Sequence, residues 1–308
     1  GSSNTGIGKD ALRANTTASD NTALGHEALE LTSTGAYNTI VGSGAGRSNT
    51  TASNNVGMGY HALRNNSTGL QNTAVGTYAL AANTVSNNTA VGYQALQTVQ
   101  AGIQLTAVGY RALANNTASY NTAVGHESLD ANTTGDMNVA VGDGTLGTNQ
   151  TGDSNVAIGH FALNAATVSN NIGIGHNTLR ATTTGPNNTA VGSLCMDANT
   201  TGAYNAAVGN QALGANTTGQ RLTAVGSSAA RSNTTASDNI AIGYDALYNN
   251  QTGGANVAVG RNALYTLGTS STFGQLNTAI GQNALQAQNT DGYNTAVGGN
   301  SLQYLTTA

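Results

Sequence analysis

The sequence predicts an all-β fold, a parallel β-solenoid (β-roll) of about eighteen coils with 17 residues each. The first observation behind this prediction is a repeat: the unit from Asn121 to Leu129 (NTAVGHESL) recurs, with small changes, from one end of the chain to the other. The second is its period. Of the seventeen spacings between the repeat glycines, thirteen are 17 residues, three are 16 and one is 21. A fixed period this short is typical of a solenoid, in which no single coil buries its own apolar face.

The third observation is the residue pattern inside each repeat, counted here with Asn121 as position 1. Position 1 is Asn in sixteen of eighteen repeats, position 3 is Ala or Gly apart from Ile40, position 5 is always Gly, and position 9 is Leu in fifteen. The pattern lacks the 3.6-residue apolar period of a helix. The repeat glycines are Gly8, Gly25, Gly42, Gly59, Gly76, Gly92, Gly109, Gly125, Gly142, Gly159, Gly175, Gly192, Gly209, Gly226, Gly243, Gly260, Gly281 and Gly298.

Each coil is expected to contain two short strands, around positions 2–4 and 7–9, joined by two turns. Gly at position 5 and the Asn132–Gly135 type of turn are expected to supply positive φ where the chain bends. Since side chains in a strand alternate between faces, positions 2 and 4 share one face and position 3 points the other way. Asn at position 1 is expected to form a ladder of amides that bond from coil to coil.

Residue size suggests which face is inside. We expect the larger residues at positions 4 and 9 to fill the coil and the small ones at positions 3 and 8 to form a flat contact face. Leucine at Ala123 and Ala140 should then disrupt chain association more than coil formation. Two large apolar side chains contribute about 3–6 kcal/mol per coil, against about 25 kcal/mol for ordering 17 residues. This shortfall predicts an oligomer, most simply a homotrimer around a rod roughly 85 Å long.

Composition excludes several classes of protein. The unbroken period predicts one repeat domain over 1–308, with repeats from about 4 to 304. Only 7% of the residues are charged and the net charge is −4, which argues against nucleic acid as a partner. No apolar run approaches the roughly 20 residues of a membrane span. The single cysteine, Cys195, occupies the small-residue position 8, so we interpret it as a buried replacement for Ala rather than a reactive thiol.

The repeats Asn72–Gly76, Asn155–Gly159 and Asn239–Gly243 resemble the head repeats of trimeric autotransporter adhesins, and the longer unit Asn88–Leu96 is similar to repeats of phage tail-fibre and related surface-fibre proteins. The resemblance implies a left-handed parallel β-roll with three chains side by side. It also implies a non-enzymatic fibre or adhesin shaft that is extracellular, on a cell surface or a virion. Autotransporter heads use a shorter coil, so the extra residues are expected to enlarge the outer turn.

No catalytic cluster, cofactor site or metal site is predicted. Gly-x-Gly sequences such as Gly57–Gly59 arise because position 3 tolerates Gly, and no crossover helix follows them. Four of the five histidines stand at position 6, a variable outward corner, where surface decoration is the simpler interpretation. They are His26, His126, His160 and His176. Among them, His160 and His176 should lie about 5 Å apart on consecutive coils, but two imidazoles make a poor metal site.

One coil, Leu264 to Leu276, breaks the period, and we name Tyr265, Leu267 and Phe273 as its speculative binding residues. The plainer interpretation is a tolerated bulge in the outer turn. Expected partners are further copies of the chain, end-to-end or domain docking at uncapped ends, and a host-surface receptor or glycan. The main alternative function is a monomeric β-solenoid that binds ice or polysaccharide along a flat face. A third, an enzyme on a parallel β-helix, lacks a carboxylate cluster.

Overall fold

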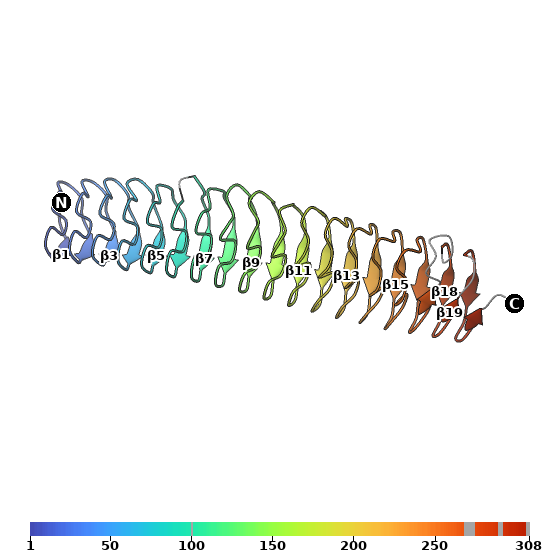
Figure 1. Cartoon of the computed structure of the whole chain (residues 1–308). Coiled ribbons are helices and arrows are strands. Elements are labelled where there is room, and N and C mark those ends of the chain that lie inside the picture. Colours follow the sequence, from blue (N-terminus) through green and yellow to red (C-terminus); the bar gives the residue numbers. More distant parts are fainter. Residues whose placement is uncertain (100, 268–274, 289–291, 306–308) are drawn as a thin grey trace. The chain divides into compact units, whose positions relative to one another are not determined.

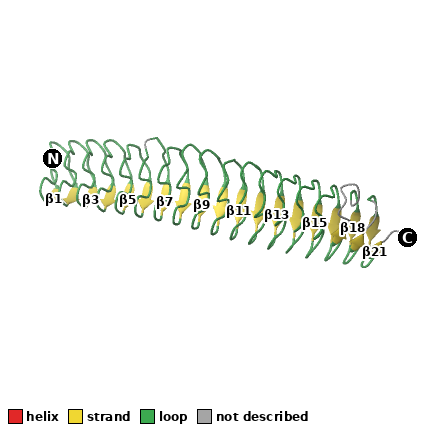
Figure 2. Cartoon of the chain, in the orientation of Figure 1, coloured by secondary structure: helices red, strands yellow, loops and turns green. Residues whose placement is uncertain are grey.

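The computed structural model describes residues 1–308 except 100, 268–274, 289–291 and 306–308. The chain forms two compact units, Gly1–Ser154 and Asn155–Ala308, and each is a parallel β-solenoid with coils of about 17 residues (Figure 1). The described residues contain strands and turns but no helix (Figure 2). The predicted all-β parallel β-solenoid is confirmed, with one three-residue strand in each of the eighteen repeats.

The strands stack in register, each position pairing with the same position of the next coil, as in Ala74 with Ala90. In the first unit they are β1 (Thr5–Ile7), β2 (Thr22–Leu24), β3 (Thr39–Val41), β4 (Val56–Met58), β5 (Thr73–Val75), β6 (Thr89–Val91), β7 (Thr106–Val108), β8 (Thr122–Val124) and β9 (Val139–Val141). In the second unit they are β10 (Val156–Ile158), β11 (Ile172–Ile174), β12 (Thr189–Val191), β13 (Ala206–Val208), β14 (Thr223–Val225), β15 (Ile240–Ile242), β16 (Val257–Val259), β18 (Thr278–Ile280) and β20 (Thr295–Val297).

The interior of each coil is built from positions 3, 8 and 9. In the coil of β7 these are Ala107, Ala112 and Leu113, all fully buried. Position 4 lies outside: Val108 keeps 36% of its surface exposed. The predicted alternation of positions 2, 3 and 4 is therefore right, and so is the prediction that position 9 lies inside, but the predicted places of positions 3, 4 and 8 are wrong. Ala123 and Ala140 are fully buried in the coil, so they do not form a contact face between chains.

The reason is that the interior is narrow, and a Leu at position 9 opposite an Ala at position 3 already fills it. Ile40, the one large residue at position 3, shows this exchange of volume. Its own coil has Gly46 at position 9, where an added Cβ would lie 3.4 Å from Ile40 Cγ2. The next coil has Gly57 at position 3, where a Cβ would lie 2.8 Å from Ile40 Cδ1. A large residue at position 3 is thus accompanied by a small residue at position 9 of the same coil and at position 3 of the next coil.

The predicted second strand at positions 7–9 is also wrong, since this segment is a turn whose residues 7 and 9 both have positive φ. In the coil of β8, Glu127 has φ 50° and Leu129 has φ 52°. This conformation turns both Ser128 and Leu129 inward, which an alternating strand cannot do. Neighbouring coils remain bonded here through backbone groups: the Leu129 N–H donates to the Thr145 carbonyl at 3.0 Å.

Glycine is required at the two bends of a coil for different physical reasons. Gly125, at position 5, has φ 140°, and an added Cβ would overlap the Gly142 carbonyl, so the predicted positive φ is confirmed there. Gly135, in the Asn132–Gly135 turn, does not have positive φ, contrary to prediction; a Cβ would instead overlap the Gly152 carbonyl of the next coil. Positive φ falls two residues later, at Met137.

Two ladders of buried asparagines run along the coils. The predicted ladder at position 1 is confirmed: the Asn38 N–H donates to Asn21 Oδ1 at 3.0 Å, and Asn38 Nδ2 donates to the Ala52 carbonyl at 2.9 Å. A second ladder, not predicted, lies at position 12, where Asn149 Nδ2 donates to Asn132 Oδ1 at 3.0 Å. These bonds fix the turn to the strand within a coil and each coil to the next. They satisfy amides that burial would otherwise penalise, with the Oδ1 atoms of Asn15 and Asn49 as exceptions.

Near the C-terminal end, positions that form turns in earlier coils become a second, small parallel sheet. Strand β17 (Thr266–Leu267) pairs with β19 (Ala287–Gln288), which pairs with β21 (Tyr304–Leu305). The start of the irregular coil therefore forms a strand.

Candidate functional site: the outward face of the sheet

The most extensive candidate site is the outward face of the sheet, formed in each unit by positions 2 and 4 of the strands. No strand carries a charged residue at either position. Position 4 is aliphatic or Met throughout. Its side chain is exposed in twelve strands, as at Val91 (37%), Ile158 (38%) and Ile242 (39%), and half-buried in the other six. Single exposed aliphatic side chains are ordinary on a protein surface, but a continuous uncharged face is typical of an interaction surface.

The free energy that a partner would gain by covering the exposed part of this face can be estimated. Fully burying a Val or Ile side chain contributes about 1.5–3 kcal/mol, so an exposed two-fifths at position 4 corresponds to about 0.6–1.2 kcal/mol. Across the nine strands of one unit this gives about 5–11 kcal/mol, comparable with the association cost of roughly 4–15 kcal/mol. A partner that covers the whole face can therefore offset much of this cost, whereas position 4 of three coils contributes only about 2–4 kcal/mol.

The corner at position 6 carries stacked rings. Tyr93 stacks on Tyr110 with centroids 5.4 Å apart, and Tyr110 stacks on His126 at 5.1 Å. His126 Nδ1 lies 2.9 Å from Asp143 Oδ1. His160 and His176 stack at 5.5 Å, which confirms the expected adjacency. No group of three potential metal-ligating side chains occurs among the residues that the structure describes.

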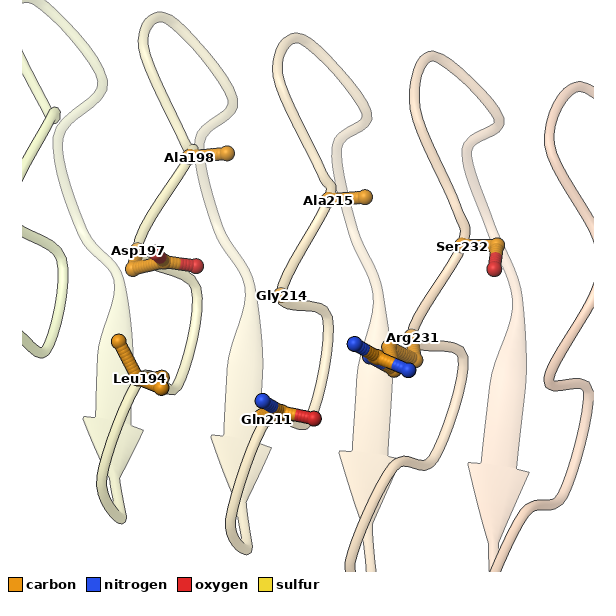
Figure 3. Close-up of a pocket in the computed structure, with 8 residues that line it drawn as sticks. All are labelled: Leu194, Asp197, Ala198, Gln211, Gly214, Ala215, Arg231 and Ser232. Carbon is orange, nitrogen blue, oxygen red and sulfur yellow. The ribbon is translucent and has the colours of Figure 1, made fainter.

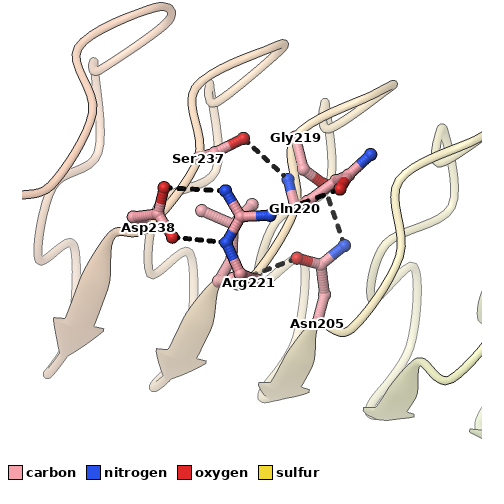
Figure 4. Close-up of polar contacts among 7 residues, drawn as sticks. Asn205, Gly219, Gln220, Arg221, Ser237 and Asp238 are labelled. Carbon is pink, nitrogen blue, oxygen red and sulfur yellow. Dashed lines mark hydrogen bonds and ion pairs between the residues drawn. The ribbon is translucent and has the colours of Figure 1, made fainter.

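Charged side chains form local pairs along the sides of the coils. The buried Glu30 carboxyl accepts hydrogen bonds from Arg13 and Arg47, and the Arg47 bond holds the pKa of Glu30 below its ordinary 4.5. Arg221 donates from Nε and Nη2 to Asp238 at 2.6 and 2.9 Å (Figure 4). All three pairs join the same position of neighbouring coils, so they support coil stacking.

The predicted binding residues of the irregular coil lie only partly within the described structure. Tyr265 stacks on Tyr248 of the preceding coil, with centroids 5.2 Å apart, and partial burial raises its pKa. Leu267 belongs to β17. The side chain of Leu267 and all of Phe273 lie outside the described residues. Of the three predicted residues, the structure therefore describes only the side chain of Tyr265, and the site as a whole lies outside the described residues.

Cys195 is fully buried, as predicted, and burial raises its pKa to about 12, so its thiol is not activated. No helix suited to crossing a bilayer occurs in the part of the chain that the structure describes. Compared with known proteins, the chain matches no protein-family model and no curated protein.

Proposed function

We propose that the chain is a non-enzymatic extracellular fibre or adhesin shaft, which assembles through the outward sheet face and spaces or presents an attachment element on a cell or virion surface. The observation that carries the proposal is the uncharged face at positions 2 and 4, which continues over all strands of each unit. The resemblance of the repeats to surface-fibre proteins supports the same function.

The regular spacing of the face favours another copy of the same chain as its partner. Its side chains recur once per coil, about 4.8 Å apart. A second copy in parallel orientation has the same step, so its side chains can fit between those of the first along the whole face. A partner without this repeat can match only a few coils, and it therefore buries less of the apolar face. Three copies around one axis close such an assembly, which is the arrangement that the resemblance to trimeric adhesin heads implies.

The experiment measures mass in solution by sedimentation equilibrium or native mass spectrometry. Three chains of 30.7 kDa give about 92 kDa. The double variant Val108→Lys/Val124→Lys places two unpaired charges on the face, and we expect it to be monomeric with an unchanged circular dichroism spectrum. Ser43→Lys/Thr77→Lys is the matched control, because both residues occupy position 6, where Lys9 stands naturally. It should remain trimeric. A wild-type monomer, or a lysine face variant of unchanged mass, would refute the proposal.

A second candidate function is ice binding by a monomer, and one observation favours it. Eleven of the eighteen strands have Thr at position 2, on the same outward face and at the same coil step. The turn threonines do not favour it, because their hydroxyls donate to the next coil, as from Thr133 Oγ1 to the Gln150 carbonyl at 2.9 Å. A monomer that shows thermal hysteresis, abolished in Val108→Lys/Val124→Lys, would establish this alternative.

A further inference from the structure

The second unit contains a cavity of about 560 Å³ on the side of the coils away from the sheet (Figure 3). It lies over the coil that contains β13 and is flanked by the coils before and after. Its walls include Leu194, Asp197, Gln211, Gly214, Arg231 and Ser232. This volume falls in the range of small-molecule sites.

The cavity exists because Gly214 interrupts a row of side chains. Position 10 carries Asp197 in the preceding coil and Arg231 in the following one, but Gly214 has nothing to place between them. The backbone does not require this glycine. Gly214 lies outside the left-handed region, and an added Cβ would meet only the Gln211 carbonyl oxygen at 3.2 Å and two oxygens beyond 3.6 Å. The backbone of the coil would therefore accept a side chain at position 214, and the gap results only from the absence of one.

The two ends of the gap have opposite hydrogen-bonding character. Asp197 Oδ1 lies 3.8 Å from the position of that added Cβ, so the carboxyl reaches over Gly214, as Figure 3 shows. Partial burial raises the pKa of Asp197, so its carboxylate is incompletely hydrated. On the other side, Arg231 Nη1 donates to Tyr248 Oη at 2.6 Å, which holds the guanidinium in place. A guanidinium carries five N–H donors.

The chemistry of the walls indicates the class of ligand. Asp197 only accepts and Arg231 only donates, whereas Gln211 and Ser232 do both. A hydroxyl group both donates and accepts, so a neutral ligand with adjacent hydroxyls can satisfy both ends at once. Leu194 and Ala215 add apolar surface for carbon-bound hydrogens.

We propose that this cavity is a saccharide-binding site, in which one hydroxyl of a sugar ring donates to Asp197 and an adjacent hydroxyl accepts from Arg231. Gln211 and Ser232 bind further hydroxyls. The proposal goes beyond the shaft function and does not depend on chain association, because every residue of the site belongs to one chain.

Saturation-transfer NMR with the methyl glycosides of glucose, galactose, mannose, fucose, N-acetylglucosamine and N-acetylgalactosamine tests the site. At about 10 mM glycoside a site of millimolar affinity is mostly occupied. We expect at least one glycoside to bind the wild type. Asp197→Asn should weaken this binding by about tenfold or more, the loss of a charge-assisted hydrogen bond, and Gly214→Gln should abolish it by filling the gap.

Gly147→Gln is the matched control, because Gly147 also stands at position 10 but in the first unit, away from Arg231, and its binding should equal that of the wild type. Gln97 occupies position 10 naturally, so the coil accepts this side chain. If circular dichroism shows that Gly214→Gln does not fold, the proposal is tested by the loss of glycoside binding in Asp197→Asn alone. The proposal is overturned if no glycoside binds, if binding persists unchanged in the variants, or if the zwitterion 4-aminobutyrate binds there and no glycoside does.

Discussion

The exchange of volume between Ile40 and Gly46 gives a quantitative test of which side chains face each other inside a coil. Gly46→Leu would restore the common position-9 residue, and its backbone permits it, because the φ of Gly46 is 57° and Leu29 and Leu63 have φ 50° and 53°. The obstacle is space: the new Cβ alone lies 3.0 Å from Leu29 Cδ2 and 3.4 Å from Ile40 Cγ2. We expect this overpacking to cost about 1–3 kcal/mol.

The complementary change, Ile40→Ala, removes most of a fully buried side chain and should cost about 2–5 kcal/mol. The double variant has the consensus pair, Ala at position 3 and Leu at position 9. It should lose only about 1 kcal/mol, for the small void left beside Gly57. The expected coupling energy is therefore about −2 to −7 kcal/mol, at or beyond the upper end of values for residues in contact.

The assay is a double-mutant cycle on local opening free energies, from amide hydrogen exchange of the coil that contains β3, with thermal unfolding alongside. Hydrogen exchange is preferred because a repeat protein need not unfold in one step. Effects of the two single variants that add to within about 0.5 kcal/mol would mean that the residues do not interact. The interior described above would then be wrong.

Further predictions concern Glu30 and Cys195. The lowered pKa of Glu30 means that its contribution to stability is fully present above its ordinary pKa of 4.5 and is lost as the pH falls through the lower, folded-state value. Exchange protection of the coil around β2 should therefore decrease with acid in this range in the wild type and less in Glu30→Gln; identical acid profiles would contradict the role of this carboxyl. Cys195 should not react with a thiol reagent at pH 8 until the protein is unfolded, because burial keeps it protonated and covered; rapid labelling of the native protein would show that the coil opens.

Much of the fold follows from the sequence because the period fixes the register. The register predicted the parallel stacking, the Asn38–Asn21 type of ladder, the glycine at position 5 and the adjacency of His160 and His176. It also places Tyr265 beside Tyr248, since both stand at position 10. Residues in register on successive coils are neighbours whatever the shape of the coil.

The orientation of the side chains was harder to predict. Alternation shows that positions 2 and 4 share a face but not which face is inside, and the choice by residue size failed because Leu113 and Ala107 together fill the interior. One signal in the sequence could have corrected this choice: the large residue Ile40 at position 3 occurs together with the small residue Gly46 at position 9, which indicates that these two positions face each other. The inward turn of both Ser128 and Leu129 depends on positive φ at a leucine, which local preference disfavours. The register places Asp197 and Arg231 on either side of Gly214, since all three stand at position 10, but the hollow that they line required the structure.

The asparagine ladder has a direction, and this bears on how the chain folds as it is made. Asn21 Oδ1 accepts the N–H of Asn38, seventeen residues later in the sequence, and Asn38 in turn accepts the N–H of Asn55. Each completed coil thus offers acceptors that only the following coil can use. During synthesis from the N-terminus, the newest coil always meets a finished template, so folding can advance one coil at a time behind the ribosome. Duplication of a coil lengthens such a protein without changing any contact except at the new joint.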